Sequence, residues 1–216
     1  MLDYNSIKSF IRSKYQIIYN NYLHSDSVFR FFNRHIWNKV DKIPGHLVSP
    51  SQEFWLYKTA RELLPDSIIV EIGSFKGRST SCLAFGCVGT KKRVYSIDTF
   101  NGNEHDFFDR EFYNTFINNL DYNKLLEYVT PLIGDSSSIA KKWELPINML
   151  FVDGSHKYQD VLNDFKNFYP FVIEGGIIAF HDITPGWKGC YDAWNDVIVK
   201  KLKKVQYCST IGIGYK

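Results

Sequence analysis

The sequence predicts an α/β fold, in which a mostly parallel β-sheet is flanked by helices. From residue 66 onward, short apolar runs alternate with segments of helical periodicity. The two richest runs, 68–72 and 149–152, are almost unbroken in apolar residues, as expected of parallel strands covered on both faces. Acidic residues follow these runs at the ends of the strands, where sheets of this kind bind ligands.

The composition indicates one large domain with a sizeable core. The 216 residues are 44% hydrophobic and 23% charged, and the formal net charge of +3 predicts no general attraction to nucleic acid. The four cysteines lack CxxC spacing, and no apolar stretch reaches the roughly 18 residues that cross a bilayer. The mixed polar and apolar residues at 1–14 do not resemble a signal peptide. We therefore expect a cytoplasmic protein with no membrane partner.

The first fifty residues predict a helical N-terminal extension. Apolar residues recur at three- and four-residue steps over 7–22, and a second, weaker run covers 28–40. Two prolines and a glycine break this pattern at 42–50. We predict a helical extension over residues 1–50, with its aromatic residues serving as a lid, and a ligand-binding domain over 51–216.

The α/β part begins with a predicted helix over 51–64, capped by Ser51 and ended by Pro65. Strands are predicted over 67–72, 93–97, 129–133, 147–152 and 176–180. Helices are predicted over 78–87, 107–120, 137–143 and 158–168, as right-handed crossovers between parallel strands. A helix over 187–202 and a closing pair of strands within 205–215 complete the domain.

A glycine-containing turn follows the first strand. Glu71 ends the strand, and Gly73 allows a tight turn with close approach of a ligand. Gly77 opens the next helix, where free backbone N–H groups and the hydroxyls of Ser79 and Thr80 can hold an anionic group. The spacing differs from the GxGxxG pattern of dinucleotide sites. Taken alone, the two glycines also fit an ordinary turn of any α/β protein.

The other strands of the predicted sheet also end in acidic residues. Asp98 ends the second strand, where a carboxylate can accept hydrogen bonds from both hydroxyls of a ribose or cap a turn. Asp135 follows the third strand, Asp153 the fourth and Asp182 the fifth. Because parallel strands end on the same side of a sheet, these carboxylates predict one shared site.

The motifs resemble those of class I S-adenosylmethionine-dependent methyltransferases. VEIGSFKGRST at 70–80 is similar to the first motif of catechol O-methyltransferase-like enzymes. FVDGSHKY at 151–158 and GGIIAFHD at 175–182 resemble the branch with cephalosporin-biosynthesis and macrocin-type sugar O-methyltransferases. The resemblance covers residues 50–190. It implies a Rossmann-like, mostly parallel sheet of seven strands in the order 3-2-1-4-5-7-6.

The resemblance also implies where S-adenosylmethionine would bind. The methionine part would lie among Glu71, Gly73, Ser74, Phe75 and Ser79, and the ribose would bind Asp98. The adenine would lie beside Thr99, Phe100, Asp135 and Ser136. Asp153 would lie near the sulfonium and the methyl acceptor.

The resemblance leaves the need for a metal open. The metal-dependent relatives hold a divalent cation at positions that correspond here to Asp153, His181 and Asp182. A cation there would orient the acceptor oxygens and lower the pKa of a hydroxyl. The His-Asp pair departs from the two carboxylates, or carboxylate and amide, of much of that branch. Mg²⁺ prefers oxygen ligands, whereas imidazole suits metals such as Mn better, so both ions and a metal-free site remain options.

A histidine is the candidate general base. His156 falls where the catechol-type enzymes place a lysine base, and a histidine can take a proton near neutral pH. Alternatively, His156 caps the following helix or packs on the cofactor, and His181 is the rival base if no metal binds. Trp143 and Trp187 flank loops near the site, where either could line an acceptor pocket or pack in the core.

We expect a small-molecule acceptor. The fourth strand is not followed by the Asn/Asp-Pro-Pro-aromatic sequence typical of enzymes that methylate nucleobase amino groups, which argues against DNA or RNA. The resemblance implies a hydroxyl of a sugar or another natural product, with a homo-oligomer as an option. A nicotinamide-dependent oxidoreductase and a non-catalytic cofactor-binding module are the competing hypotheses.

Overall fold

The structure is a computed structural model that describes residues 33–44, 49–101 and 110–216. Residues Val40–Lys216 form one compact unit. Of the preceding unit, helix α2 (Arg34–Val40) is described, within the predicted helical run at 28–40. The predicted helix over 7–22 and the lid role lie outside the described residues. None of the described helices has the length and apolar character needed to span a membrane.

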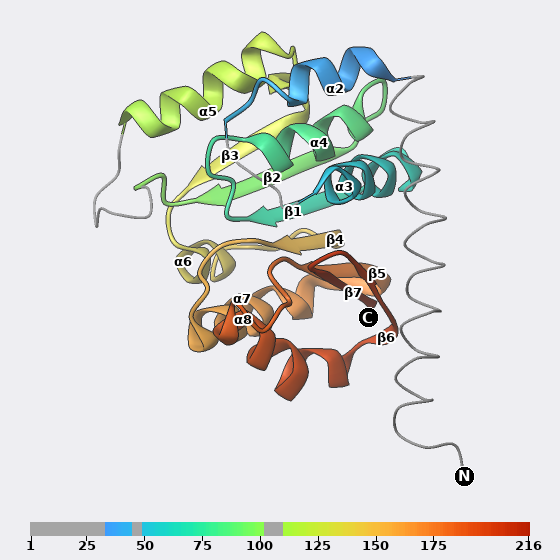
Figure 1. Cartoon of the computed structure of the whole chain (residues 1–216), viewed down its shortest axis with the longest axis vertical. Helices are drawn as coiled ribbons and strands as arrows, with labels where there is room; N and C mark the ends of the chain where they lie inside the picture. The colour runs from blue at the N-terminus through green and yellow to red at the C-terminus, as the bar shows by residue number, and fades with distance from the viewer. Residues whose placement is uncertain (1–32, 45–48, 102–109) are drawn as a thin grey trace. The chain divides into compact units, whose positions relative to one another are not determined.

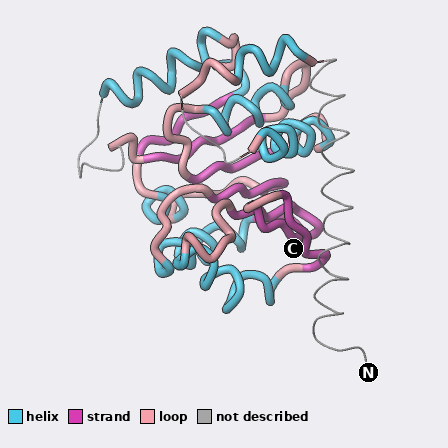
Figure 2. Tube along the Cα trace, in the orientation of Figure 1, coloured by secondary structure: helices cyan, strands magenta, loops and turns pink. Residues whose placement is uncertain are grey.

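The sheet has seven strands in the order β3-β2-β1-β4-β5-β7-β6, which confirms the predicted order (Figure 1). Strands β1 to β5 run parallel to one another, and β7 runs antiparallel to both β5 and β6. Figure 2 shows the strands stacked as one layer with helices around it. The strands are β1 (Ile68–Ile72), β2 (Arg93–Asp98), β3 (Val129–Ile133), β4 (Ile147–Val152), β5 (Val172–Phe180), β6 (Lys203–Cys208) and β7 (Ile211–Tyr215).

Helices that are neighbours in sequence pack together in two groups. Helix α3 contacts α4, and α7 contacts both α6 and α8. These helices are α3 (Pro50–Glu62), α4 (Arg78–Cys87), α5 (Arg110–Tyr122), α6 (Ser136–Ala140), α7 (Tyr158–Phe168) and α8 (Lys188–Ala193). Central strands β1 and β4 are almost completely buried, as their unbroken apolar runs predicted.

Several predicted boundaries differ from the structure by a few residues, and two of these differences have clear local reasons. Ser49, not Ser51, caps α3, because its backbone N–H donates to Gln52 Oε1 at 3.1 Å and Pro50 suits the first helical position. Strand β5 begins at Val172, four residues before the predicted start. The chain passes through Gly175 at φ +74° and an irregular register against β4, so the Glu-Gly-Gly segment belongs to the strand rather than preceding it.

The helix predicted over 187–202 is interrupted. Helix α8 is followed by a widened π turn over Trp194–Ile198 and a 3₁₀ turn over Val199–Lys201. The widened turn begins at Trp194, which is fully buried and donates its indole N–H to the Tyr207 hydroxyl at 3.0 Å. A Cβ on Gly212 of β7 would lie 2.8 Å from that indole, so the two elements pack at the closest distance a glycine allows.

Candidate active site

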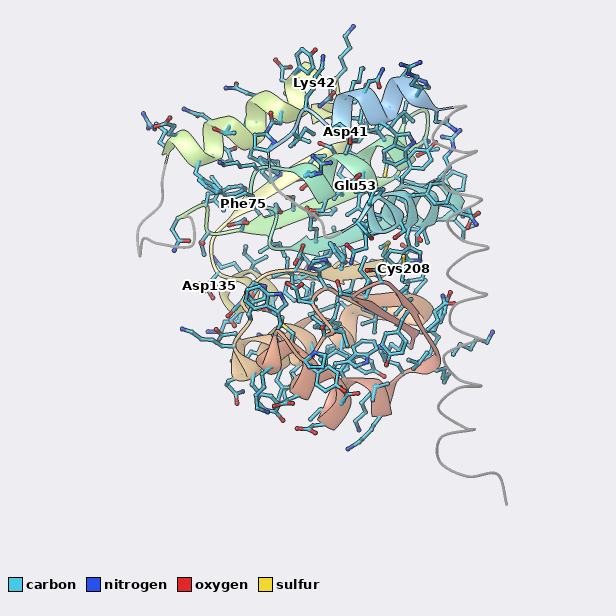
Figure 3. All side chains as sticks on the ribbon, viewed as in Figure 1. Asp41, Lys42, Glu53, Phe75, Asp135 and Cys208 are labelled. Atoms are coloured by element: carbon cyan, nitrogen blue, oxygen red, sulfur yellow. The ribbon has the colours of Figure 1, made fainter. Side chains whose placement is uncertain are left out.

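The carboxyl ends of five parallel strands are joined by backbone hydrogen bonds just beyond the strands. These bonds run from Gly73 N to Ile97 O, Gly134 N to Asp98 O, Asp153 N to Ile72 O and His181 N to Val152 O, at 2.8–2.9 Å. Phe75 and Asp135, labelled in Figure 3, lie on loops on this side of the sheet. The structure therefore brings the predicted site residues to one end of the sheet.

Gly73 has a structural role in the packing of two loops. Its φ is +87°, and a Cβ at this position would lie 2.1 Å from the backbone oxygen of Asp153. The close approach is thus between the loops after β1 and β4. This packing holds Asp153 next to the β1 turn.

Glu71 is a fully buried carboxylate within β1. The Thr80 hydroxyl donates to its Oε2, and the Ser96 hydroxyl lies 3.4 Å from the same atom. Burial raises the pKa of Glu71 to about 7, against the lowering effect of the nearby Ser79 and Thr80 hydroxyls. Among the described residues, Oε1 has no hydrogen-bond partner. One oxygen of this buried acid is therefore available to a donor from outside the described residues.

Ser96 was missed by the sequence reasoning. It lies on β2 and shares a hydrogen bond with Ser74, another predicted site residue, and both are buried. A serine in the middle of an otherwise apolar strand was the signal that could have found it. The pair ties the loop after β1 to the neighbouring strand.

Asp98 holds the loop after β1 through backbone hydrogen bonds. Its Oδ2 accepts from the N–H groups of Ser74 at 2.7 Å and Phe75 at 2.8 Å, and its Oδ1 accepts from Phe100 N at 2.8 Å. The turn-capping alternative is thus observed. A carboxylate oxygen has two acceptor positions, so Oδ1 keeps one that these bonds do not use.

Three residues on the loops after β1 and β2 differ in their exposure. Phe100 is fully buried and packs on Tyr113 and Phe116 with ring centroids 5.0 Å apart, so it takes part in core packing at this end of β2. Thr99 is exposed and donates to Asn101 Oδ1 at 2.6 Å. Phe75 is 39% exposed in a left-handed conformation, with φ 48°. A ligand can therefore reach the Phe75 ring on the loop after β1.

Asp135 and Ser136 begin helix α6. Asp135 caps the helix, since its Oδ1 accepts from Ser138 N at 2.9 Å, and these hydrogen bonds lower the pKa of its exposed carboxyl. Ser136 donates to Asp164 of α7, an acid that the sequence reasoning missed. Burial raises the pKa of Asp164 to about 6. A carboxylate on the apolar face of a helix was the available signal.

Two histidines and two aspartates form a cluster after β4 and β5, hereafter the His-Asp cluster (Asp153, His156, His181 and Asp182). His181 Nδ1 lies 3.0 Å from Asp153 Oδ1 and 3.2 Å from Asp182 Oδ2. His156 Nε2 lies 2.9 Å from the same Asp182 oxygen. Asp182 adopts a left-handed conformation, with φ 60°, which a residue with a side chain rarely adopts. Such strain is typical of functional positions.

The charges within the cluster are mutually dependent. Burial alone would lower the pKa of His181, but the nearby carboxylates of Asp153 and Asp182 raise it to about 10. Burial would raise the pKa of Asp182, but His156 and His181 hold it well below its ordinary value. For Asp153, burial dominates and raises the pKa. These shifts favour a positive charge on His181 and a negative charge on Asp182.

Three members of the His-Asp cluster could also bind a metal ion. Asp153, His181 and Asp182 each offer one ligand atom, and these atoms all lie within 4.8 Å of one another. Neither nitrogen of His181 makes a well-directed hydrogen bond to any described residue. The donor set of one imidazole and two carboxylates suits Mn, Fe, Co or Zn better than Mg²⁺.

Trp187 borders the His-Asp cluster and is 46% exposed. Its indole stacks on the His156 imidazole with ring centroids 4.0 Å apart and planes 20° apart. His156 does not cap helix α7, whose N-cap is Lys157. Trp143, in contrast, is buried and donates to Leu145 O at 2.7 Å, so core packing describes that tryptophan and not Trp187.

Arg78, also missed, anchors the start of α4 to the preceding part of the domain. Its guanidinium donates to Glu53 Oε1 at 2.6 Å and to the Ile43 carbonyl at 2.8 Å. It also reaches Asp41 at 3.3 Å; Asp41 and Glu53 are labelled in Figure 3. The arginine within the GRST segment therefore fixes the helix whose first turn carries Ser79 and Thr80.

Comparison with known proteins finds a matching family model and a relative that matches over part of its length. A family model described as a methyltransferase domain matches residues 70–183, just over half of the chain. The uncharacterized protein y4gI of Sinorhizobium fredii is 29% identical over 120 residues, which are 53% of this chain and only 13% of that relative.

Solved structures of methyltransferases share the fold. An O-methyltransferase from Bacillus cereus in complex with SAH has a TM-score of 0.61 at 16% identity, covering 92% of this chain and 90% of that one. CalS11, a TDP-rhamnose 3'-O-methyltransferase of calicheamicin biosynthesis, has a TM-score of 0.56 at 17% identity, covering 76% of each chain. With the matched family model, these findings confirm the predicted fold and family: the chain belongs to the family of methyltransferase domains.

Proposed function

We propose that this protein transfers the methyl group of S-adenosylmethionine to a hydroxyl of a small molecule, with a sugar or another natural product as acceptor. The observation that carries the proposal is the meeting of a buried acid, Glu71, and the His-Asp cluster at the carboxyl end of one sheet. A methyl donor bound there would lie between an acid that suits its cationic part and a histidine that can accept a proton.

The chain's residues fit the cofactor. S-adenosylmethionine carries an ammonium group, and Glu71 Oε1 is a buried acceptor without a described partner. Asp98 keeps one acceptor position for a ribose hydroxyl, and Phe75 exposes a ring beside it. We place the methionine part against the loop after β1 and the ribose at Asp98.

In the proposed reaction, His156 is the general base. When bound, S-adenosylmethionine supplies a methyl group on a sulfonium, which an acceptor oxygen attacks in line as the carbon–sulfur bond breaks. Because ionised Asp182 accepts a hydrogen bond, His156 Nε2 carries the hydrogen and donates it. That tautomer leaves Nδ1 free to take the hydroxyl proton. Asp182 thus fixes the tautomer and the orientation of the base.

A divalent cation is a second element of this proposal. It would be held by Asp153, His181 and Asp182, and it would orient the acceptor oxygens and favour loss of the hydroxyl proton. Without it, the His181 imidazolium balances the two carboxylates. Assays with added Mn²⁺, added Mg²⁺ and added EDTA separate the two cases, since only a metal-dependent enzyme loses turnover in EDTA and regains it with the ion.

The acceptor proposal has support from related folds. Two structures that share the fold are described as O-methyltransferases, one of which acts on TDP-rhamnose. The protein from Bacillus cereus was solved with SAH, the product of the donor proposed here. These relatives favour a hydroxyl acceptor and S-adenosylmethionine over a nicotinamide cofactor.

The test pairs binding with turnover. Calorimetry should show binding of S-adenosylhomocysteine and none of NAD; the reverse would favour an oxidoreductase. With S-adenosylmethionine labelled in the methyl group, label should pass to small hydroxylated compounds. His156→Ala should cut this turnover at least a hundredfold, as expected for loss of a general base, with the affinity for S-adenosylhomocysteine within about twofold. Full turnover in His156→Ala would remove His156 as the base, and cofactor binding without turnover in any condition would favour a non-catalytic module.

A further inference from the structure

The loop between β3 and α6 lies next to the proposed ribose site. Gly134 in this loop donates its backbone N–H to Asp98 O at 2.9 Å, and Asp98 is paired with Ile133 at the ends of β2 and β3. In a nucleoside, a single bond joins the base to the ribose. A ribose bound at Asp98 can therefore bring its base to this loop, where Ser136 begins α6 as a half-buried residue.

Asp164 of α7 holds the hydroxyl of Ser136 in one orientation. The Ser136 hydroxyl donates to Asp164 Oδ1. Asp164 is buried, and its Oδ2 lies 3.9 Å from the position of a Cβ on Gly154, in the loop after β4. Burial raises the pKa of Asp164 to about 6, so at slightly alkaline pH the carboxyl is ionised and can only accept hydrogen bonds. The hydrogen of the Ser136 hydroxyl is therefore committed to Asp164.

A serine whose hydrogen is committed in this way offers a ligand only lone pairs. A hydroxyl has one hydrogen and two acceptor positions, so Ser136 Oγ acts as an acceptor toward a ligand on this loop. Asp135, another acceptor on the loop, is exposed, and water can replace a hydrogen bond that it loses. Ser136 is half-buried, so a ligand that presents a second acceptor to Ser136 would leave both acceptors unsatisfied and would lose affinity.

We propose that Ser136 is a specificity-determining residue that accepts a hydrogen bond from the 6-amino group of adenine in the methyl donor, and that Asp164 is a positioning residue that keeps Ser136 in the accepting state. This inference rests on the proposed binding of S-adenosylmethionine and adds the pair of residues that recognises its base. Adenine carries a donor at the 6-position. Hypoxanthine carries an oxo group there, which is an acceptor. The Ser136–Asp164 pair thus favours adenine over hypoxanthine.

The test compares two ligands by calorimetry on the full chain at about pH 8, where Asp164 is ionised. The ligands are S-adenosylhomocysteine and S-inosylhomocysteine, in which hypoxanthine replaces adenine. Wild type should bind S-adenosylhomocysteine about tenfold more tightly, the effect of one unsatisfied acceptor. In Asp164→Ala, the Ser136 hydroxyl can rotate and donate to the oxo group, so the ratio of the two dissociation constants should fall to about twofold. Ser136→Ala should lower the ratio in the same way, and it provides the test if Asp164→Ala does not fold.

A matched control separates recognition of the base from general loosening of α6. Asn167 Nδ2 on α7 donates to Ser137 Oγ at 3.0 Å, so Asn167→Ala removes a neighbouring bond between the same two helices and leaves Ser136 and Asp164 in place. The ratio in Asn167→Ala should equal that of wild type. A wild-type ratio near one, an unchanged ratio in Ser136→Ala, or an equal fall in Asn167→Ala would overturn the inference. Failure of wild type to bind either ligand would instead overturn the proposed function.

Discussion

The fold shifts the pKa of several individual side chains far from the ordinary value. Glu71 is the clearest case, because it is a carboxylate in a central strand with no cation beside it among the described residues. Burying an acid costs stability when it ionises. A bound ligand with a positive charge beside Glu71 would offset this cost.

The pH dependence of stability tests this account of Glu71. Its pKa in the folded state, about 7, lies above the ordinary 4.5, so the folded protein holds the proton more tightly than the unfolded chain. The stabilising contribution is complete below pH 4.5 and is lost as the pH rises through 7. Urea unfolding should therefore show Glu71→Gln gaining stability over wild type between pH 5 and 8, on the order of 2–3 kcal/mol. The free energy of unfolding of the control Glu144→Gln, at an exposed position, should change with pH as in wild type. If the free energy of unfolding of Glu71→Gln also changed with pH as in wild type, burial of Glu71 would not explain the pH dependence.

Substitution of Asp98 should lower both the affinity for the cofactor and the stability of the loop after β1. Asp98→Ala should weaken S-adenosylhomocysteine binding at least tenfold, since hydrogen bonds to a charged group contribute roughly 1.5–3 kcal/mol. It should also lower the melting temperature, because three backbone N–H groups lose their acceptor. Calorimetry and thermal unfolding measure the two effects. The exposed Asp66→Ala is the control, and an unchanged dissociation constant would remove Asp98 from the site.

At the scale of the elements, the site depends on the contact between the loops after β1 and β4. Gly73 makes that contact possible, and its loss should separate the loops that carry Glu71 and Asp153. The same logic applies to Gly189 and the loop that carries His156. In both places a glycine is needed for close approach of two backbones, so a single methyl group is expected to disturb the site.

Gly73→Ala tests this against a matched position. Gly73 and Gly89 have similar φ values, +87° and +76°, but no described atom lies within 4 Å of a Cβ on Gly89. Gly89→Ala should therefore cost only the backbone strain, about 1–2 kcal/mol. Gly73→Ala adds a clash at 2.1 Å and should cost clearly more, measured by urea unfolding, with loss of S-adenosylhomocysteine binding. Equal costs for the two variants would show that the loop contact is unimportant.

The elements themselves were largely predictable from the sequence. The bounds of β3, β4, α4 and α7 match the prediction, because their periodicity ends at clear local signals. The start of β5 and the break after α8 were not predictable, since they depend on a bulge against β4 and on the packing of Trp194 against Gly212. Local patterns set the elements, and contacts between elements set their irregularities.

The same division holds for the site. That the acidic residues after the strands share one end of the sheet follows from parallel topology alone. The stack of Trp187 on His156, the shared oxygen of Asp182 and the hydrogen bond between Ser74 and Ser96 join residues from different loops and strands. No spacing in the sequence encodes these partners, so they required the folded structure.

At the scale of the whole molecule, a ligand that spans the ends of several strands should stabilise the entire α/β unit. At a hundred times its dissociation constant, S-adenosylhomocysteine should add about 2.7 kcal/mol to the free energy of unfolding. For a domain of this size that corresponds to a rise in melting temperature of roughly 5–10 °C. NAD at the same concentration should give no rise. An equal rise with NAD, or none with S-adenosylhomocysteine, would contradict the proposed site.

If one site at the carboxyl end of the sheet binds the methyl donor, a crystal structure with S-adenosylhomocysteine will show the ligand there. We expect the ribose within hydrogen-bond distance of Asp98, the ammonium group beside Glu71, and the sulfur facing Asp153 and His156. Electron density for the ligand at any other place, or packed side chains filling this site in the crystal, would contradict it.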